Sequence, residues 1–345
     1  MAMPNEEYWA KRFEMLENAQ HNKAEKFVKD MEKVYARTLD ALEKDIEQWY
    51  SRLAKNNGIS TNEAKKLLTA NELKEFKWTV EEYIEKGREN AVNQKWMKQL
   101  ENASARVHIT HLQAIQMQLN QHLELWATQY ENMFTEFLEE QYDYQYYHVA
   151  YEVAVGTNVG VAFSAINTVQ LEKLLSRPWA ADGYTFSERI WREKTKMTNE
   201  LFLQLGQSLA RGEGPEKTVD RLYKDFSSDN SKYQIRRVVM TESAFFSSTA
   251  QQDSFKELEV DKYEVLATLD NKTSKICQDL DGKVFDMSEY VVGSTAPPFH
   301  PFCRTVTIPY LEGKSGERFA RDGEGNGIAV PSSMKYKEWY DKFVK

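Results

Sequence analysis

Three side chains near the C-terminal end of the sequence have the types and the spacing of metal ligands. Cys277 and Cys303 are the two cysteines of the chain, and His300 stands three residues before the second of them. Thiolate sulfur and imidazole nitrogen are the usual ligands of a tetrahedral zinc ion. The three residues therefore predict three ligands of one candidate metal site.

The sequence offers several fourth ligands for such a site. Asp270, Asp279 and Asp281 are candidates because zinc also accepts carboxylate oxygen. Water in the fourth position would leave the open coordination that is typical of a catalytic zinc. The alternative interpretation has no metal: the thiols are buried and the histidine hydrogen-bonds to the backbone of its loop.

The same residues allow a second chemistry, hydrolysis, with Cys277 as nucleophile and His300 as base, or with zinc activating a water molecule. A nucleophile needs a base within hydrogen-bonding reach and a third group that orients this base. The sequence supplies two such residues on separate loops and no evident third. We therefore predict no catalytic residue and keep the hydrolase as a lesser alternative.

The first of the two loops follows a strand. Residues 264–269 alternate in a β-like way, and residues 273–280 predict one or two helical turns. The pair Asp281-Gly282 favours a tight turn, and residues 283–285 are typical of a returning strand. The sequence thus predicts a strand, a short helix and a second strand around the first cysteine.

The second loop is stiffened by prolines on both sides of the histidine. Pro297, Pro298 and Pro301 fix φ and remove backbone donors. A stiff backbone presents His300 and Cys303 at a low cost in conformational entropy. We expect this loop to face the first one.

In order and spacing, these loops resemble the phage head morphogenesis family, the minor head proteins related to protein F of phage Mu. That family joins a strand ending in aspartate, a turn with threonine and cysteine, an Asp-Gly pair and a Pro-Pro-x-His-Pro-x-Cys-Arg segment. The matching residues are Leu269-Asp270, Thr273, Cys277, Asp281-Gly282 and Pro297 to Arg304. The scaffold of the motif consists of Asp281, Gly282, Pro297, Pro298 and Arg304.

The resemblance extends upstream and covers about residues 187–310. Its further matches are a helix near Trp191, Gly212, the segment Pro215 to Leu222 and the segment Arg236 to Glu242. Many members have further cysteines at the two positions that Ser274 and Thr305 occupy here. Because three ligands without a fourth rarely make a closed structural site, we predict no cofactor, with zinc as the alternative.

The N-terminal part of the chain is dominated by helical periodicity. In residues 5–56 and 89–140, apolar residues recur at spacings of three and four, which predicts long helices. These residues are Tyr35, Leu39, Leu42, Ile46, Trp49 and Leu53, and Leu112, Ile115, Leu119, Leu123, Trp126, Tyr130 and Phe134. Capping boxes at Ser60 and Thr69 predict that two further helices begin at these residues. Residues 1–140 are therefore a predicted helical arm or bundle.

Three regions follow this helical part. Residues 141–186, rich in tyrosine, are predicted to be a connector and a packing hub. Residues 187–310 are predicted to form the domain that resembles the phage family. Residues 311–345 contain glycines among charged residues, which is typical of loops, and return to a helical pattern at 334–343.

The predicted domain at residues 187–310 begins with three helices, which are expected to pack against the small sheet. On the third helix, Arg236, Arg237 and Glu242 lie within helical reach and predict a salt-bridge cluster. The predicted fold is mainly α with a small C-terminal α+β unit: a long N-terminal helical arm or bundle precedes a helical body and a short antiparallel sheet.

Composition limits the classes of partner. The formal net charge of −8 argues against a strongly basic nucleic-acid binder and favours protein partners. Two cysteines do not make the disulfide framework of a secreted protein, and the polar N-terminus lacks the core of a signal peptide. No run reaches the roughly 18 apolar residues of a membrane span. We expect synthesis in the cytoplasm and no membrane partner.

The resemblance implies a structural minor capsid protein of a phage, associated with the portal vertex and acting in head morphogenesis and in DNA packaging or ejection. Its implied partners are the portal protein and other capsid proteins, with phage DNA as a further candidate. Its implied location is the virion, at the capsid interior or portal vertex, after synthesis in the bacterial host. The long helices add an expected homo-oligomer. The alternative is the carrier domain of a phage-derived secreted toxin.

Overall fold

The structure is a computed structural model of the chain. It describes residues 6–56, 111–157, 165–180, 182–210, 217, 219–221, 224, 229–310, 317–321, 324, 327–331, 334 and 336–343. The two helices predicted from Ser60 and Thr69, residues 89–110 of the second long helix, and Gly212 and Pro215 of the family resemblance lie outside the described residues.

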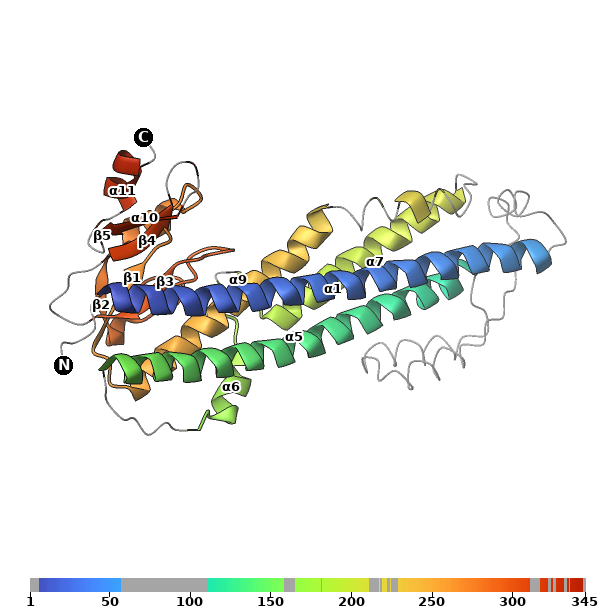
Figure 1. The fold of residues 1–345 in the computed structure, drawn as a ribbon. Coiled ribbons are helices and arrows are strands. Elements are labelled where there is room, and N and C mark those ends of the chain that lie inside the picture. The colour runs from blue at the N-terminus through green and yellow to red at the C-terminus, as the bar shows by residue number, and fades with distance from the viewer. Residues whose placement is uncertain are drawn as a thin grey trace. The chain divides into compact units, whose positions relative to one another are not determined.

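Long helices make up most of the described chain (Figure 1). They are α1 (Glu6–Asn56), α5 (His111–Thr157), α7 (Phe186–Ala210) and α9 (Asp229–Glu257). The shorter α6 (Thr168–Leu175) begins after Asn167, whose side chain accepts a hydrogen bond from the amide of Gln170. The predicted mainly α fold is confirmed. Within the described residues, no helix combines the length and the apolar character needed to cross a membrane.

The expected end of the second long helix at Glu140 is wrong, because α5 continues to Thr157. The tyrosine-rich segment is therefore part of a helix. Buried residues recur along it in pairs at intervals of four, which is the spacing of one helix face. They are Gln141, Tyr142, Gln145, Tyr146, Val149, Ala150 and Val153. Tyr147 and Tyr151 point to the exposed side, so the hub is limited to the buried face.

The chain forms two compact units, each built from segments that are far apart in sequence. Unit 1 comprises Met1–Val28, Thr135–Thr185 and Arg236–Lys345, and unit 2 comprises Lys29–Phe134 and Phe186–Ile235. The helices α1, α5 and α9 each contribute residues to both units.

Unit 2 is a helical unit in which the predicted apolar stripes are buried wherever their side chains are described; the side chains of Trp49, Leu53, Leu112 and Ile115 lie outside that description. Its buried side chains include Tyr35, Leu39, Leu42 and Ile46 of α1, Leu119, Leu123, Trp126, Tyr130 and Phe134 of α5, and Ile190, Leu201 and Leu205 of α7. A buried ion pair joins Lys194 of α7 to Glu124 of α5. The Thr198 hydroxyl donates to Asn120 Oδ1 at 3.1 Å, so polar contacts also fix α7 on α5.

Unit 1 contains a three-stranded antiparallel sheet. The strands are β1 (Lys262–Leu266), β2 (Val284–Asp286) and β3 (Val306–Pro309), in the order β2-β1-β3. The central strand pairs Glu264 with Val284 on one side and with Ile308 on the other. The predicted short antiparallel sheet is confirmed, with the first strand two residues earlier than expected.

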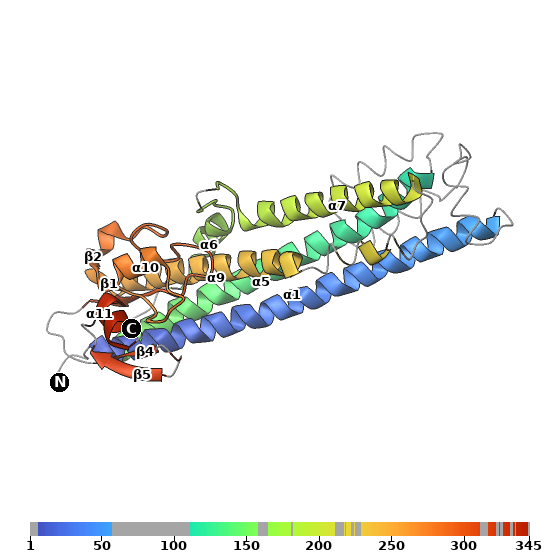
Figure 2. The ribbon, with the colours of Figure 1, turned by 90° about the horizontal axis from the view of Figure 1, so that it is seen from above.

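The sheet of unit 1 lies beside α9 and beside the parts of α1 and α5 that belong to this unit (Figures 1 and 2). The main apolar core of unit 1 joins these elements and includes Trp9, Phe13 and Leu16 of α1, Val149 and Val153 of α5, Phe255 of α9, and Tyr263, Val265, Leu266, Val306 and Ile308 of the sheet. The sequence predicted that the three helices from residue 187 onward pack against the sheet. This prediction is wrong in part: α9 contributes to the core beside the sheet, but α7 belongs to unit 2. Periodicity shows which face of a helix is apolar and does not show which distant segment covers it.

The expectation of a loop-like tail is also wrong in part. The strands β4 (Glu317–Arg321) and β5 (Gly327–Pro331) form an antiparallel hairpin, and the expected terminal helix is α11 (Tyr336–Phe343). Glycines among charged residues suit a hairpin turn as well as a loop, so composition did not separate the two. The fully buried Trp339 packs with Leu269, Ala320 and Val330, which docks the tail on unit 1.

Replacement of Gly156 by alanine should destabilise unit 1, because α5 touches α1 closely at this position. An ideal Cβ at Gly156 would lie 2.8 Å from Trp9 Cζ2 and 2.9 Å from Tyr8 Cε1. Because Trp9 is buried and cannot move freely, we expect the free energy of unfolding to fall by about 1–2 kcal/mol. Urea denaturation measures this change.

Gly206 in α7 provides the matched control, since an added Cβ there meets no atom within 4 Å. Alanine at Gly206 should raise stability by about 0.5–1 kcal/mol through its better helix propensity. Equal effects of the two substitutions would contradict the proposed clash.

Candidate functional site

The first loop of the candidate site is closed by the Asp-Gly turn. The buried Asp281 carboxylate accepts a hydrogen bond from the amide of Ala267 at 2.9 Å, just after β1. The amide of Gly282 donates to the carbonyl of Val265 at 2.8 Å, and its φ of 69° lies in the left-handed region that favours glycine. These bonds hold Asp281 and Gly282 against the end of β1.

A short helix between these points carries the first cysteine. The helix α10 (Lys275–Leu280) begins after Ser274, whose hydroxyl accepts a hydrogen bond from the amide of Cys277. The Cys277 side chain is almost fully buried, in a small cluster with Ala267 and Cys303. The serine cap therefore fixes the backbone position of the cysteine.

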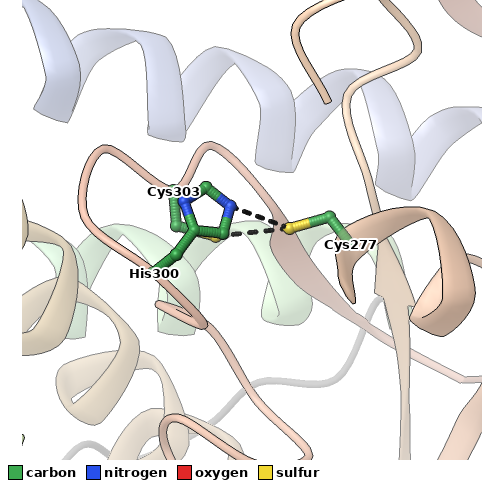
Figure 3. Close-up of side chains that lie close together, drawn as sticks. All are labelled: Cys277, His300 and Cys303. Carbon is green, nitrogen blue, oxygen red and sulfur yellow. Dashed lines mark hydrogen bonds between the residues drawn. The ribbon is translucent and has the colours of Figure 1, made fainter. Parts of the chain in front are cut away.

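The second loop turns sharply between its two candidate ligands. The amide of Cys303 donates to the carbonyl of His300 at 3.2 Å, and Phe302 between them has a φ of 61°. A left-handed conformation is unfavourable for a phenylalanine and is retained where the surrounding structure enforces it. The turn places the side chains of His300 and Cys303 on the same side of the loop, facing Cys277 (Figure 3).

The two loops face each other, as predicted. Cys277 Sγ lies 3.2 Å from His300 Nε2 and 3.7 Å from Cys303 Sγ. One ligand atom from each of the three residues lies within 4.8 Å of the others. His300 Nδ1 is 2.8 Å from the carbonyl oxygen of Pro301. Donation from Nδ1–H to this carbonyl leaves the lone pair of Nε2 directed at the sulfurs.

The two thiols have opposite pKa shifts. The hydrogen bond from Cys277 to Cys303 and burial raise the pKa of Cys277 far above its usual range. The same hydrogen bond, opposed by burial and helped by backbone donors, lowers the pKa of Cys303 to about 7. An activated cysteine nucleophile requires a lowered pKa, so this arrangement does not favour Cys277 as the nucleophile of a hydrolase.

Asp270, a candidate fourth ligand, forms an ion pair with Arg304. Its carboxylate accepts two hydrogen bonds from the Arg304 guanidinium, at 2.6 and 2.9 Å. The amide of Lys272 and the hydroxyl of Thr273 donate to it as well. Burial raises the pKa of Asp270, but the hydrogen bonds and charge of Arg304, with the amide and hydroxyl donors, lower it overall. Asp270 and Arg304 thus tie the two loops together beside the three-residue cluster.

The other two candidate carboxylates also have partners away from the cluster. Asp279 is exposed and forms an ion pair with Lys275 at 2.6 Å, and Asp281 holds the amide of Ala267. Sequence reasoning noted Thr305 only as a position where the family often has a cysteine, and it missed that this side chain lies beside both cysteine sulfurs. Its position two residues after Cys303 was the available signal.

The three residues of the predicted helix cluster lie on α9. Arg236 forms an ion pair with Glu25 of α1, and Arg237 is exposed. The buried Glu242 carboxylate accepts a hydrogen bond from Trp179 Nε1 at 2.8 Å. These contacts of Arg236 and Glu242 connect α9 to other segments of unit 1.

Comparison with known proteins gives a family-model match that includes the candidate site, and two relatives. The family model "Phage Mu protein F like protein" matches residues 199–308, which contain Cys277, His300 and Cys303. The NAD(+)–arginine ADP-ribosyltransferase EFV of Enterococcus faecalis is 25% identical over 251 residues, 69% of this chain and 50% of that protein. Minor head protein GP7 of Bacillus phage SPP1 is 26% identical over 226 residues, 60% of this chain and 70% of that protein.

The chain therefore matches half the length of the ADP-ribosyltransferase EFV and 70% of the length of minor head protein GP7. No solved structure matches the chain.

Proposed function

Residues 199–308 belong to the phage head morphogenesis family of Mu F-like proteins, and on that premise we propose that the chain is a structural minor head protein acting at the portal vertex. It binds the portal protein and other capsid proteins and takes part in DNA packaging or ejection, within the virion. The observation that carries the proposal is the match to minor head protein GP7, which covers 70% of that protein.

A structural role agrees with the way the motif residues are used. Asp281 and Gly282 close the turn after β1, and Asp270 and Arg304 join the two loops. The raised pKa of Cys277 is the opposite of what an activated nucleophile needs. The net charge of −8 favours protein partners over an extended DNA contact, so DNA binding is a secondary part of the proposal.

Direct binding to the portal protein tests this proposal. We expect the purified chain to co-sediment in analytical ultracentrifugation with the portal protein encoded by the same phage genome. The portal protein of an unrelated phage, at the same concentration, is the control. Mass spectrometry of purified mature heads should also detect the chain. Absence from the heads together with no co-sedimentation would contradict the proposed function.

A second candidate function is the carrier region of a phage-derived toxin. The match to the ADP-ribosyltransferase-named protein favours it, because this match covers 69% of the chain and half of the relative. We propose no transferase activity for the chain itself. Incubation with labelled NAD⁺ and an arginine-rich acceptor should give no labelled product. Labelling above that of a heat-treated sample would overturn the non-enzymatic proposal.

A further inference from the structure

We propose that Cys277, His300 and Cys303 bind a zinc ion, which joins helix α10 to the loop at residues 297–305. The ligand atoms are the two Sγ atoms and His300 Nε2. This site goes beyond the proposed head function and does not depend on it. It also revises the expectation of no cofactor, because the geometry of the three side chains was not accessible from their spacing.

Two separations between the ligand atoms are close to those around a tetrahedral ion, and all three lie within 4.8 Å. Metal–sulfur bonds of about 2.3 Å at a tetrahedral angle place two sulfurs about 3.8 Å apart. Cys277 Sγ and Cys303 Sγ are 3.7 Å apart and both thiols are free. With a zinc–nitrogen bond of about 2.0–2.1 Å, a sulfur and a nitrogen should be about 3.5 Å apart. The distance from Cys277 Sγ to His300 Nε2 is 3.2 Å, which a small shift of the imidazole brings into range.

The surroundings already orient each ligand. The hydrogen bond from His300 Nδ1 to the carbonyl of Pro301 selects the tautomer that exposes Nε2 to a metal. The Ser274 cap holds the amide of Cys277, and the His300 carbonyl holds the amide of Cys303. The thiols bind as thiolates and release their protons to solvent. Because the cysteines are buried and His300 is partly exposed, the metal reaches the site from the histidine side.

The fourth coordination position is left to a water molecule on the open histidine side. The aspartates that the sequence offered are engaged by Arg304, Lys275 and the Ala267 amide. Thr305 is almost fully buried, and its side chain lies beside both sulfurs. A donor to thiolate sulfur stabilises the negative charge of a metal-bound thiolate. Thr305 is therefore a positioning residue. A cysteine in its place would supply the fourth ligand of a closed site.

Metal analysis of the full chain tests the site directly. Protein purified with reductant and without chelator, after growth with added zinc, should contain near-stoichiometric zinc by plasma mass spectrometry. Cys303→Ser should lose it. His148→Asn is the matched control, because His148 is an exposed histidine on α5 and should leave the zinc content unchanged. Wild-type protein that stays free of zinc after reconstitution, or equal zinc in Cys303→Ser, would overturn the proposal.

Two further measurements keep the test valid if Cys303→Ser fails to fold. Wild-type protein loaded with cobalt should show thiolate-to-cobalt charge-transfer absorption and the intense visible bands of tetrahedral cobalt. Thr305→Cys, which adds a third thiolate beside the ion, should release zinc to a chelator at least tenfold more slowly than wild type. A spectrum of octahedral cobalt, unchanged zinc release, or a Cys277–Cys303 disulfide in the reduced preparation would count against the site. Failure to bind the portal protein would leave all these results unaffected.

Discussion

Replacement of Asp270 by asparagine lowers the free energy of unfolding by about 2–3 kcal/mol, because it leaves the Arg304 guanidinium without its charged partner. The Asp270 side chain is 10% exposed and that of Arg304 is 35% exposed. Solvent screening at Arg304 therefore keeps the loss below the value for a fully buried pair. Asparagine retains the size of the side chain and an acceptor for the amide of Lys272. Urea denaturation followed by circular dichroism measures the change.

Asp279→Asn is the matched control for this prediction. Asp279 lies on α10, nine residues after Asp270, and both side chains of its ion pair with Lys275 are exposed. Exposed pairs contribute little, so this variant should stay within about 0.5 kcal/mol of wild type. Similar losses in the free energy of unfolding of the two variants would show that the Asp270–Arg304 pair contributes no more to stability than an exposed pair does.

The Asp270–Arg304 pair also predicts a dependence of stability on pH. Burial raises the pKa of Asp270, but Arg304 and the neighbouring donors lower it below the usual range in the folded state. The unfolded chain therefore binds this proton more readily than the folded chain does. The stabilisation is complete above the unfolded pKa of about 3.9 and is lost as pH falls through the lower folded pKa. The difference between wild type and Asp270→Asn should shrink below about pH 4. A constant difference from pH 7 to pH 3 would be evidence against the shift.

Helical periodicity predicted the elements that depend on local sequence. The stripe from Leu119 to Phe134 is buried as expected. The helix was predicted to end at Glu140 because tyrosines alternate with polar residues after this position, which obscures the helical spacing. Tyr142 and Tyr146, four residues apart, in fact lie on one helix face. The assignment of partners failed where it depended on distant segments. The packing of Trp9 and Phe13 against Val149 and the sheet has no local signal.

The candidate site was predictable as a set of residues and not as a geometry. Residue type and spacing identified Cys277, His300 and Cys303, and the prolines indicated that the loops would meet. The same reasoning could not distinguish a carboxylate that faces a metal from one that faces an arginine. Asp270 pairs with Arg304 across 34 positions of sequence, and such a pairing appears only after the chain folds.

A chain of buried glutamines in unit 1 connects the helices to the sheet. Gln20 of α1 donates to Gln145 Oε1 of α5 at 3.1 Å, and Gln145 Nε2 donates to Gln251 Oε1 of α9 at 3.1 Å. Gln251 Nε2 in turn donates to the carbonyl of Thr307 in β3 at 2.7 Å and also bonds its hydroxyl. All of these side chains are buried. Buried polar groups that lose a partner are costly, so the chain of bonds should specify how β3 docks on the helices.

Gln251→Leu should therefore lower the free energy of unfolding by about 2–4 kcal/mol, since it removes the acceptor of Gln145 and the donor to Thr307. Leucine has nearly the same volume, so the loss reports on the polar partners and not on a cavity. Gln129→Leu, an exposed glutamine on α5, is the control and should stay within about 0.5 kcal/mol of wild type.

The double variant Gln145→Leu/Gln251→Leu distinguishes the network from simple packing. It replaces a donor together with its acceptor, and Gln20 keeps its bond to the carbonyl of Gln141 at 3.2 Å. Because removal of both partners leaves fewer buried groups unpaired, the double variant should lose about 1 kcal/mol less than the sum of the single variants. Losses that add within about 0.3 kcal/mol would show that the two side chains act independently. In that case the docking of β3 would rest on the apolar contacts of Val306 and Ile308.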